Sequence, residues 1–163
     1  MHVFLKNKKI IFLDYRIKCS IGKRGIKKKR TEGDKSTPKG IFKIKYLLYR
    51  KDRLSDIKTK LKKYSIKKNM GWCDDVNSKK YNKLIILPSN LKHEKLYIKD
   101  HIYDLVIVIN YNMNPIVKNK GSAIFLHIAK KNYSPTKGCV AISKENMRIL
   151  LKNLGKKNKI IIY

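Results

Sequence analysis

The segment YDLVIVIN (residues 103–110) is the strongest candidate for a buried β-strand in this chain. Its unbroken run of leucine and β-branched residues is typical of a strand covered on both faces. Two more apolar runs follow, GSAIFLHIA (121–129) and VAIS (140–143), and the turn-forming stretches NMNP (112–115) and PTKG (135–138) separate the three. Short apolar strands joined by turns predict a mainly β fold.

Further strands are expected on both sides of this region. Residues 10–20 carry apolar residues at 11, 13, 15, 17 and 19, an alternation that predicts one half-buried strand. Short strands are also expected at 1–6, 41–49, 84–87 and 159–163. Residues 144–154 have apolar residues at helical spacing, with Ser143 as N-cap and Gly155 as the stop. Weak helical spacing at 52–64 leaves a second helix open.

Two stretches lack such a pattern. Glycine, proline and the charged run KKKR break up residues 21–40, and a loop of this length in a small domain is usually functional or mobile. Residues 70–82 are irregular and rich in aromatic and acidic side chains. We therefore predict a β-sandwich-like mixed sheet with one or two helices, in a single domain over residues 1–163.

Length and composition exclude several classes of protein. The chain of 163 residues is 42% hydrophobic, enough for one core and too much for a disordered chain. No apolar run approaches the ~20 residues of a transmembrane helix, and no signal peptide develops in MHVFLKNKK. The three cysteines are widely spaced and form no CxxC pair, which argues against a disulfide framework and against the usual zinc sites.

The net charge of +30 suggests a nucleic-acid partner, but the composition argues against a specific one. Lysine, isoleucine, asparagine and tyrosine have codons rich in A and T, and together they fill 81 positions. A biased genome would produce the same enrichment. Only 6 of the 41 basic residues are arginine, the residue that makes bidentate phosphate and base contacts. We expect no specific nucleic-acid binding, and an anionic envelope polymer stays open as a partner.

The strongest chemical pattern is a histidine and a cysteine twelve residues apart. His127 ends an apolar strand, and Cys139 follows Gly138 in a turn before the next strand. Glycine permits tight backbone geometry, so that successive N–H groups at such a turn can point at a developing oxyanion. A histidine on the neighbouring strand can accept the thiol proton. If His127 is protonated beside the thiolate, the pKa of Cys139 should lie below the usual ~8.5.

This arrangement resembles the catalytic motif of the YkuD-type L,D-transpeptidases, and the resemblance extends over nearly the whole chain. The catalytic block is His127 followed by Thr136-Lys137-Gly138-Cys139-Val140. Upstream matches to a short branch of the family are KRTEGDKSTPKGIF (29–42), GWCDD (71–75), YN (81–82), YDL (103–105), NMNP (112–115) and GSAIFLH (121–127). The chain departs from the commonest form of the family at Lys137, where a histidine is usual, and at Ala141, where asparagine or arginine is usual.

The resemblance implies a cysteine acyltransferase acting on peptidoglycan stem peptides, without a cofactor or metal. Cys139 would be the nucleophile, His127 the proton donor and acceptor, and Gly138 a backbone oxyanion donor. Lys137, Thr136, Tyr133 and Arg30 would contact substrate. The implied place of action is the cell envelope or periplasm, and we expect a monomer. Sequence does not identify the third group that orients His127.

Other readings stay open. The same thioester can be resolved by water, which would make the protein an L,D-carboxypeptidase. A non-enzymatic protein that binds an anionic polymer or nucleic acid is the rival of a different class. Cys73 and Cys19 are better explained by packing, and the polar segment around His93 and His101 is expected to be exposed. The acidic loop residues Glu32 and Asp34 either shape the substrate entrance or hold their loop by ion pairs.

Overall fold

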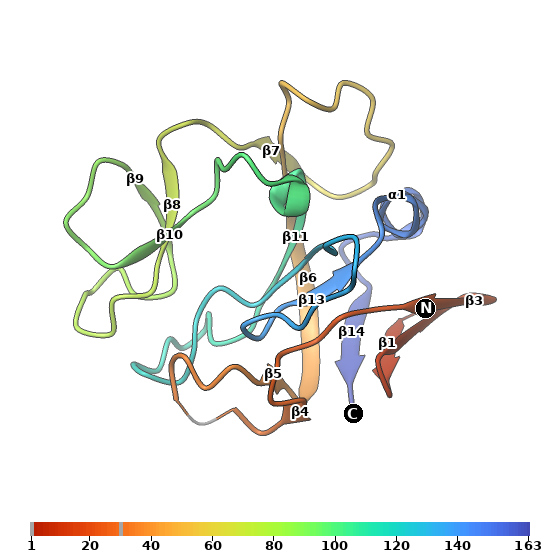
Figure 1. Cartoon of the computed structure of the whole chain (residues 1–163), viewed down its shortest axis with the longest axis horizontal. Helices are drawn as coiled ribbons and strands as arrows, with labels where there is room; N and C mark the ends of the chain where they lie inside the picture. The colour runs from red at the N-terminus through yellow and green to blue at the C-terminus, as the bar shows by residue number, and fades with distance from the viewer. Residues whose placement is uncertain (1, 30) are drawn as a thin grey trace.

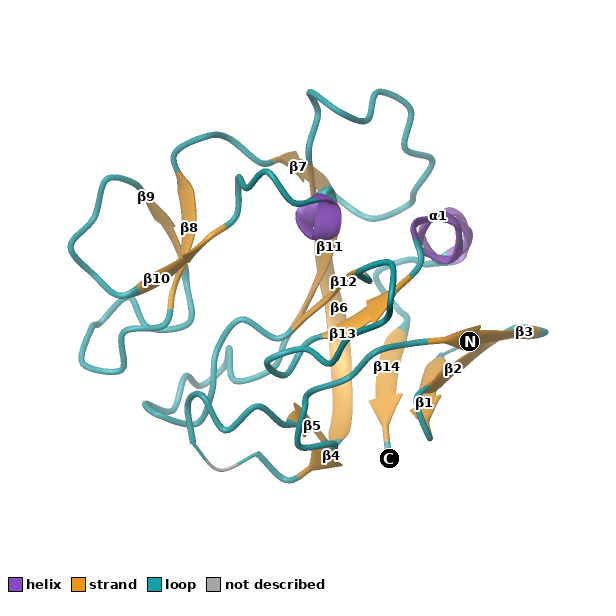
Figure 2. Cartoon of the chain, in the orientation of Figure 1, coloured by secondary structure: helices purple, strands orange, loops and turns teal. Residues whose placement is uncertain are grey.

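β-strands dominate the regular structure of this protein (Figure 2), whose computed structural model describes residues 2–29 and 31–163. The strands are β1 (Val3–Lys6), β2 (Lys9–Phe12), β3 (Tyr15–Lys18), β4 (Ile26–Lys27), β5 (Thr37–Pro38), β6 (Gly40–Tyr49), β7 (Lys63–Ser65), β8 (Met70–Cys73), β9 (Leu84–Ile86), β10 (His93–Lys95), β11 (Leu105–Ile109), β12 (Phe125–Ile128), β13 (Val140–Ile142) and β14 (Lys159–Ile162). The helices are the 3-10 helix η1 (His101–Tyr103) and α1 (Lys144–Asn153). The predicted mainly β class with one or two helices is confirmed.

One large mixed sheet forms the body of the molecule, with the strand order β13-β12-β11-β6-β14-β1-β2-β3 and β7 beside β6. The buried strand expected at residues 103–110 is β11, and all five of its residues are buried. It pairs antiparallel with β6 and β12, and β13 pairs parallel with β12. The segment that the sequence singled out is therefore an interior strand of the sheet.

The large sheet curls until its two edges meet. Ser20, just beyond β3, exchanges backbone hydrogen bonds of 2.8 and 2.9 Å with Ala141 of β13. The inward side chains form the main core together with Met147, Leu150 and Leu151 of α1. The turn that carries Cys139, just before β13, thus lies next to the seam that closes the sheet.

A small sheet of β8, β9 and β10 packs on part of the outer face of the large sheet and gives the fold its second layer. Figure 1 shows it on the opposite side of the molecule from β1 and β3. Trp72 of β8 is buried against Phe125 of β12, with ring centroids 5.1 Å apart. This second core also contains Tyr103 and Cys139.

The single strand predicted at residues 10–20 is wrong. Leu13 adopts a positive φ of 52°, and the chain reverses there into the hairpin of β2 and β3. The buried positions of β2 are Ile10 and Phe12, whereas Ile11 and Leu13 are exposed. A turn in mid-segment changes which residues of an alternating pattern face the core.

Two irregular segments also differ from expectation. Residues 52–62 form no helix, yet Leu54, Ile57 and Leu61 are buried in the main core, which accounts for their apolar spacing. The stretch 70–82, expected to be irregular, contains β8. In α1 the predicted N-cap is confirmed, since the Ser143 hydroxyl accepts a hydrogen bond from the Asn146 N–H. The helix ends at the extended residue Leu154, one residue before Gly155.

Candidate active site

A cleft of about 750 Å³ opens between the small sheet and the ends of β12 and β13. Both members of the predicted pair, Cys139 and His127, line it. Lys137, Thr136 and Gly138 line it as well, and the opposite wall includes His93 and Glu94 of β10. The described residues contain no group of three or more His, Cys, Asp or Glu side chains placed to hold a metal ion.

Cys139 is held in the cleft by backbone groups just before β12 and at its first residue. Its thiol donates to the Ala123 carbonyl at 3.1 Å, and its Sγ accepts the Phe125 N–H at 3.3 Å. Only 9% of the residue is exposed. The thiol is therefore fixed in direction, with one N–H already placed to stabilise a negative charge on sulfur.

The turn that carries Cys139 is tied down on both sides. The Thr136 hydroxyl donates to the Cys139 carbonyl at 2.6 Å and accepts the Gly138 N–H at 3.1 Å. Gly138 has a φ of 145°, and a Cβ there would lie 2.9 Å from the Ser36 carbonyl oxygen. Glycine is thus required at this position, because its positive φ is unfavourable for other residues and because a Cβ would collide with Ser36.

His127 lies on β12, with its neighbour in register, Ala141, on β13. Its Nδ1 lies 2.9 Å from the Ile128 carbonyl oxygen. A carbonyl oxygen only accepts, so this contact places the proton on Nδ1 and leaves Nε2 as the acceptor. The group that orients the imidazole is therefore the backbone of the next residue, which no side-chain motif can reveal.

Burial leaves the pair neutral at rest. It raises the pKa of the Cys139 thiol to about 12, with Glu94 adding to the rise, and lowers the pKa of His127 to about 4. Both pKa values shift in this way because burial removes water from each group and so disfavours its charged form. The expectation that the Cys139 pKa lies below ~8.5 is wrong for this structure, since burial outweighs the Phe125 N–H and Lys29.

A second wall of the site comes from residues to which the sequence assigned no role. The Tyr103 ring stands edge-on to His127, with centroids 5.3 Å apart, and its hydroxyl donates to Glu94 Oε1 at 2.5 Å. Burial raises the pKa of Glu94. His93, expected to be exposed, also lines the cleft. The polar sequence around β10 gives no sign that a second sheet folds over Cys139.

Asn82 contacts Cys139 indirectly, through Ala123. Its Oδ1 accepts the Trp72 indole N–H at 2.9 Å and the Ala123 N–H at 3.1 Å. Its Nδ2 donates to the carbonyls of Tyr111 and Asn112. Ala123 has a positive φ of 50°, a conformation that costs energy for a residue with a Cβ. The Asn82 carboxamide therefore stabilises the strained residue whose carbonyl receives the Cys139 thiol.

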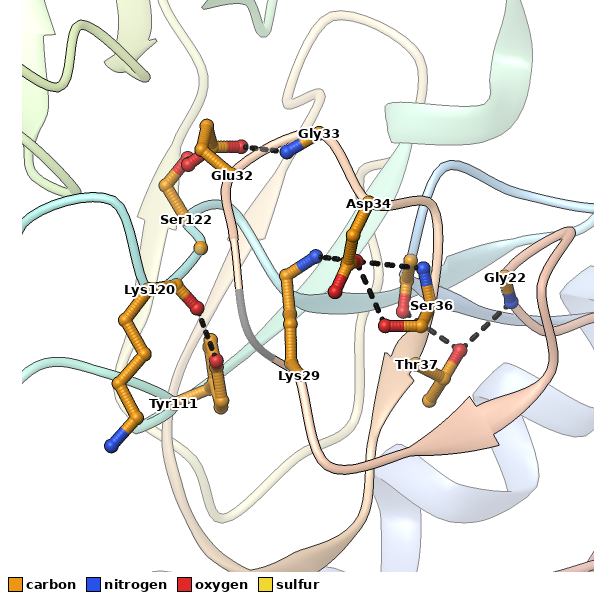
Figure 3. A network of polar contacts seen from close by, with 12 residues as sticks. Gly22, Lys29, Glu32, Gly33, Asp34, Ser36, Thr37, Tyr111, Lys120 and Ser122 are labelled. Carbon is orange, nitrogen blue, oxygen red and sulfur yellow. Dashed lines mark hydrogen bonds and ion pairs between the residues drawn. The ribbon is translucent and has the colours of Figure 1, made fainter.

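The loop before β5 is held by a network of polar contacts, which Figure 3 shows, and it contacts the turn that carries Cys139. Buried Lys29 forms an ion pair with Asp34, which accepts hydrogen bonds from the backbone and hydroxyl of Ser36. Next along the chain, the Thr37 hydroxyl accepts the Gly22 N–H and donates to the Gly138 carbonyl at 2.9 Å. Of the two roles left open for Asp34, the structure shows the ion pair that holds its loop.

Glu32 holds a neighbouring segment. It accepts hydrogen bonds from the hydroxyls of Tyr81 and Ser122, and it also lines the cleft. Ser122 precedes Ala123, so these contacts steady the same stretch of chain that Asn82 fixes.

The remaining predicted residues have mixed outcomes. Tyr133 lies away from the cleft lining, and Lys18 Nζ is 4.7 Å from its ring centroid. Arg30 lies outside the described residues. Cys19 and Cys73 are buried in the interior, as packing residues are. His101 is exposed and pairs with Asp104.

Comparison with protein families gives a match over almost the whole chain. The family described as the L,D-transpeptidase catalytic domain, YkuD, matches residues 1–162. No curated protein matches the chain. Among the described residues, no helix is long and apolar enough to cross a membrane. A match over all but the last residue shows that this chain belongs to the YkuD family of L,D-transpeptidase catalytic domains.

Proposed function

We propose that this protein is an L,D-transpeptidase that transfers an acyl group from a peptidoglycan tetrapeptide stem through a thioester on Cys139. The observation that carries the proposal is the geometry of the pair. A thiol of fixed direction and an imidazole with Nε2 free to accept a proton line one cleft.

The proposed reaction begins with the transfer of the thiol proton to His127 Nε2 as sulfur attacks the carbonyl carbon at the L-centre of the diamino acid. Because the resting pair is neutral, the ion pair forms only as the attack proceeds. The C–N bond to the terminal D-alanine then breaks, and His127 returns the proton to the leaving amine. An amine of a second stem attacks the thioester, loses its proton to His127 and releases the Cys139 thiol.

The developing oxyanion is stabilised by backbone N–H groups of the catalytic turn, at Gly138 and Cys139. For Gly138 to donate, its N–H must exchange the Thr136 hydroxyl for the oxyanion. That bond is 3.1 Å long in the resting site, and the charge-assisted bond to the oxyanion would replace it. Lys137 lines the same cleft and adds positive potential. The family acts on the cell wall outside the cytoplasm, and we place this protein's reaction in the envelope.

The test is incubation with a defined tetrapeptide muropeptide, followed by mass spectrometry of the products and of the protein. We expect loss of D-alanine, a dimeric product and an acyl adduct on Cys139. Cys139→Ala should abolish turnover and adduct, whereas the matched variant Cys19→Ala should keep most activity. Released D-alanine without dimer would assign the protein as a carboxypeptidase. Full turnover by Cys139→Ala would refute the mechanism.

A further inference from the structure

The outer face of the large sheet is covered over only part of its width. On β6, β11 and β12 its side chains pack in the second core, among them Leu48, Val106 and Phe125. On the neighbouring strands the same kind of face is open to solvent, partly so on β14 and β1 and fully so on β2. Ile41, at the start of β6, is 64% exposed, and Ile11 of β2 is 43% exposed.

These exposed residues form a continuous row. Ile11 is paired in register with Phe4 of β1, Phe4 with Ile161 of β14, and Ile161 with Ile41 of β6. Residues paired in this way point to one face, and strands ~4.8 Å apart give the row a length of about 14 Å. The Phe4 ring also stacks on Tyr163, which is 52% exposed. A water-facing sheet surface normally carries polar residues at such positions.

Basic residues flank this apolar row on both sides. Lys6 and Lys9 are paired in the next row on one side, and Lys43 and Lys159 are paired on the other. Arg16 of β3 is paired with Ile11 and extends the row at its end. The uncharged residues Tyr163 and Leu13, both exposed, also border the row.

We propose that this face, the apolar row with its basic flanks, docks on the surface of an anionic lipid bilayer. A bilayer surface offers both parts of what the face requires, because anionic headgroups pair with lysine and the boundary below them accepts Ile, Phe and Tyr side chains. A second copy of this chain would place its own basic residues against these lysines, and the like charges would repel. A nucleic acid or anionic polysaccharide would pair with the lysines and leave the isoleucines in water.

Docking in this way leaves the active site accessible. In Figure 1, β1 and β14 lie apart from the small sheet that forms one wall of the cleft. None of the residues of the apolar row lines the cleft, so docking through this row does not occupy it.

The first test places a reporter indole on the face. Ile41→Trp is compared with Ile86→Trp, a matched substitution at a 60% exposed isoleucine of the small sheet. Vesicles of brominated phosphatidylcholine with phosphatidylglycerol should quench and blue-shift the indole at position 41 and leave that at position 86 unchanged. Native Trp72 is buried and serves as an internal control. Equal quenching at positions 41 and 86, or none at either, would refute the proposal.

The second test separates docking from simple adsorption of a protein with a net charge of +30. The double variant Ile11→Ser, Ile41→Ser should bind phosphatidylglycerol vesicles about tenfold more weakly than the wild type in co-sedimentation, because it loses apolar contacts. The control Ile86→Ser, Val117→Ser should stay within about twofold, and both should bind heparin equally. Equal vesicle binding by the two double variants would show adsorption only. A dimer in sedimentation that Ile41→Ser abolishes would show self-association instead.

Discussion

Cys139 and His127 are buried as an uncharged pair, and this determines how the Cys139 thiol reacts in the free protein. With the thiol pKa raised to about 12, Cys139 should react slowly with iodoacetamide at pH 7, and its rate should still rise above pH 9. The measurement is the alkylation rate against pH in a Cys19→Ala, Cys73→Ala background. A rate that levels off below pH 7 would show a stable thiolate and contradict this reading.

Asn82 gives a second prediction at the scale of single residues. Asn82→Ala leaves the buried N–H groups of Trp72 and Ala123 without their acceptor, at about 1–3 kcal/mol each, and releases Ala123 from its strained conformation. We expect a lower melting temperature and a turnover reduced more than tenfold at temperatures where circular dichroism shows the variant folded. The exposed control Asn77→Ala should change neither. Wild-type turnover by folded Asn82→Ala would remove the supporting role.

That Cys139 and His127 lie in one cleft could be predicted from sequence, because it depends on a local pattern of a strand, a turn and a glycine. Tyr103, Glu94 and Asn82 could not be given roles, because each acts across a contact between distant segments. Asn82 meets Ala123 over 41 positions, and Glu94 reaches the site only when β10 folds over β12. The orienting group of His127 is a backbone carbonyl, which every residue possesses.

At the scale of elements, a helix or strand could be predicted where a single sequence pattern extends over the whole element. Strand β11 and helix α1 could be predicted because each shows its signal within about ten residues. For β11 the signal is an unbroken apolar run, and for α1 it is helical spacing of apolar residues after an N-cap. The hairpin of β2 and β3 was missed because Leu13 carries no turn signal, although it adopts a positive φ. The apolar residues at 54, 57 and 61 have the spacing of a helix, but they lie in an irregular segment that places each of them separately in the core.

The loop that carries Asp34 yields a prediction for an element. Asp34→Asn leaves the buried ammonium of Lys29 without its counter-charge, which should lower the free energy of unfolding by about 3 kcal/mol at pH 7. Activity should fall too, because the same loop positions Thr37 under Gly138. The measurements are urea unfolding and turnover, with exposed Asp56→Asn as the control expected to match the wild type.

The pH dependence of this effect has a definite sign. Lys29 and Ser36 outweigh burial and hold the pKa of Asp34 well below its usual range in the folded protein. The stabilisation is therefore complete above the unfolded pKa of ~3.9 and is lost as pH falls below about 4. The difference between wild type and Asp34→Asn should shrink over that acidic range. A difference that grows on acidification would contradict the ion-pair account.

For the whole molecule, the net charge of +30 predicts non-specific attraction to polyanions. Duplex DNA should bind with a dissociation constant of about 10⁻⁴–10⁻⁶ M near physiological salt, without sequence preference, and the affinity should fall steeply as salt rises. Turnover of a small soluble muropeptide should change far less, because its barrier depends on groups inside the cleft. Parallel salt titrations of both measure this. Sequence-selective DNA binding that survives high salt would favour a nucleic-acid function.

The parallel pairing of β1 with β14 has a consequence for how the enzyme is made. Residues 3–5 find their partners at residues 160–162, and β14 also separates β1 from β6 in the sheet. Contacts of such long sequence separation form late and slowly in folding. A growing chain on the ribosome therefore cannot join the hairpin strands β1, β2 and β3 to the rest of the sheet until β14 has been synthesised. Because the seam beside Cys139 depends on that hairpin, the surroundings of Cys139 are complete only after β14 has been synthesised and has paired.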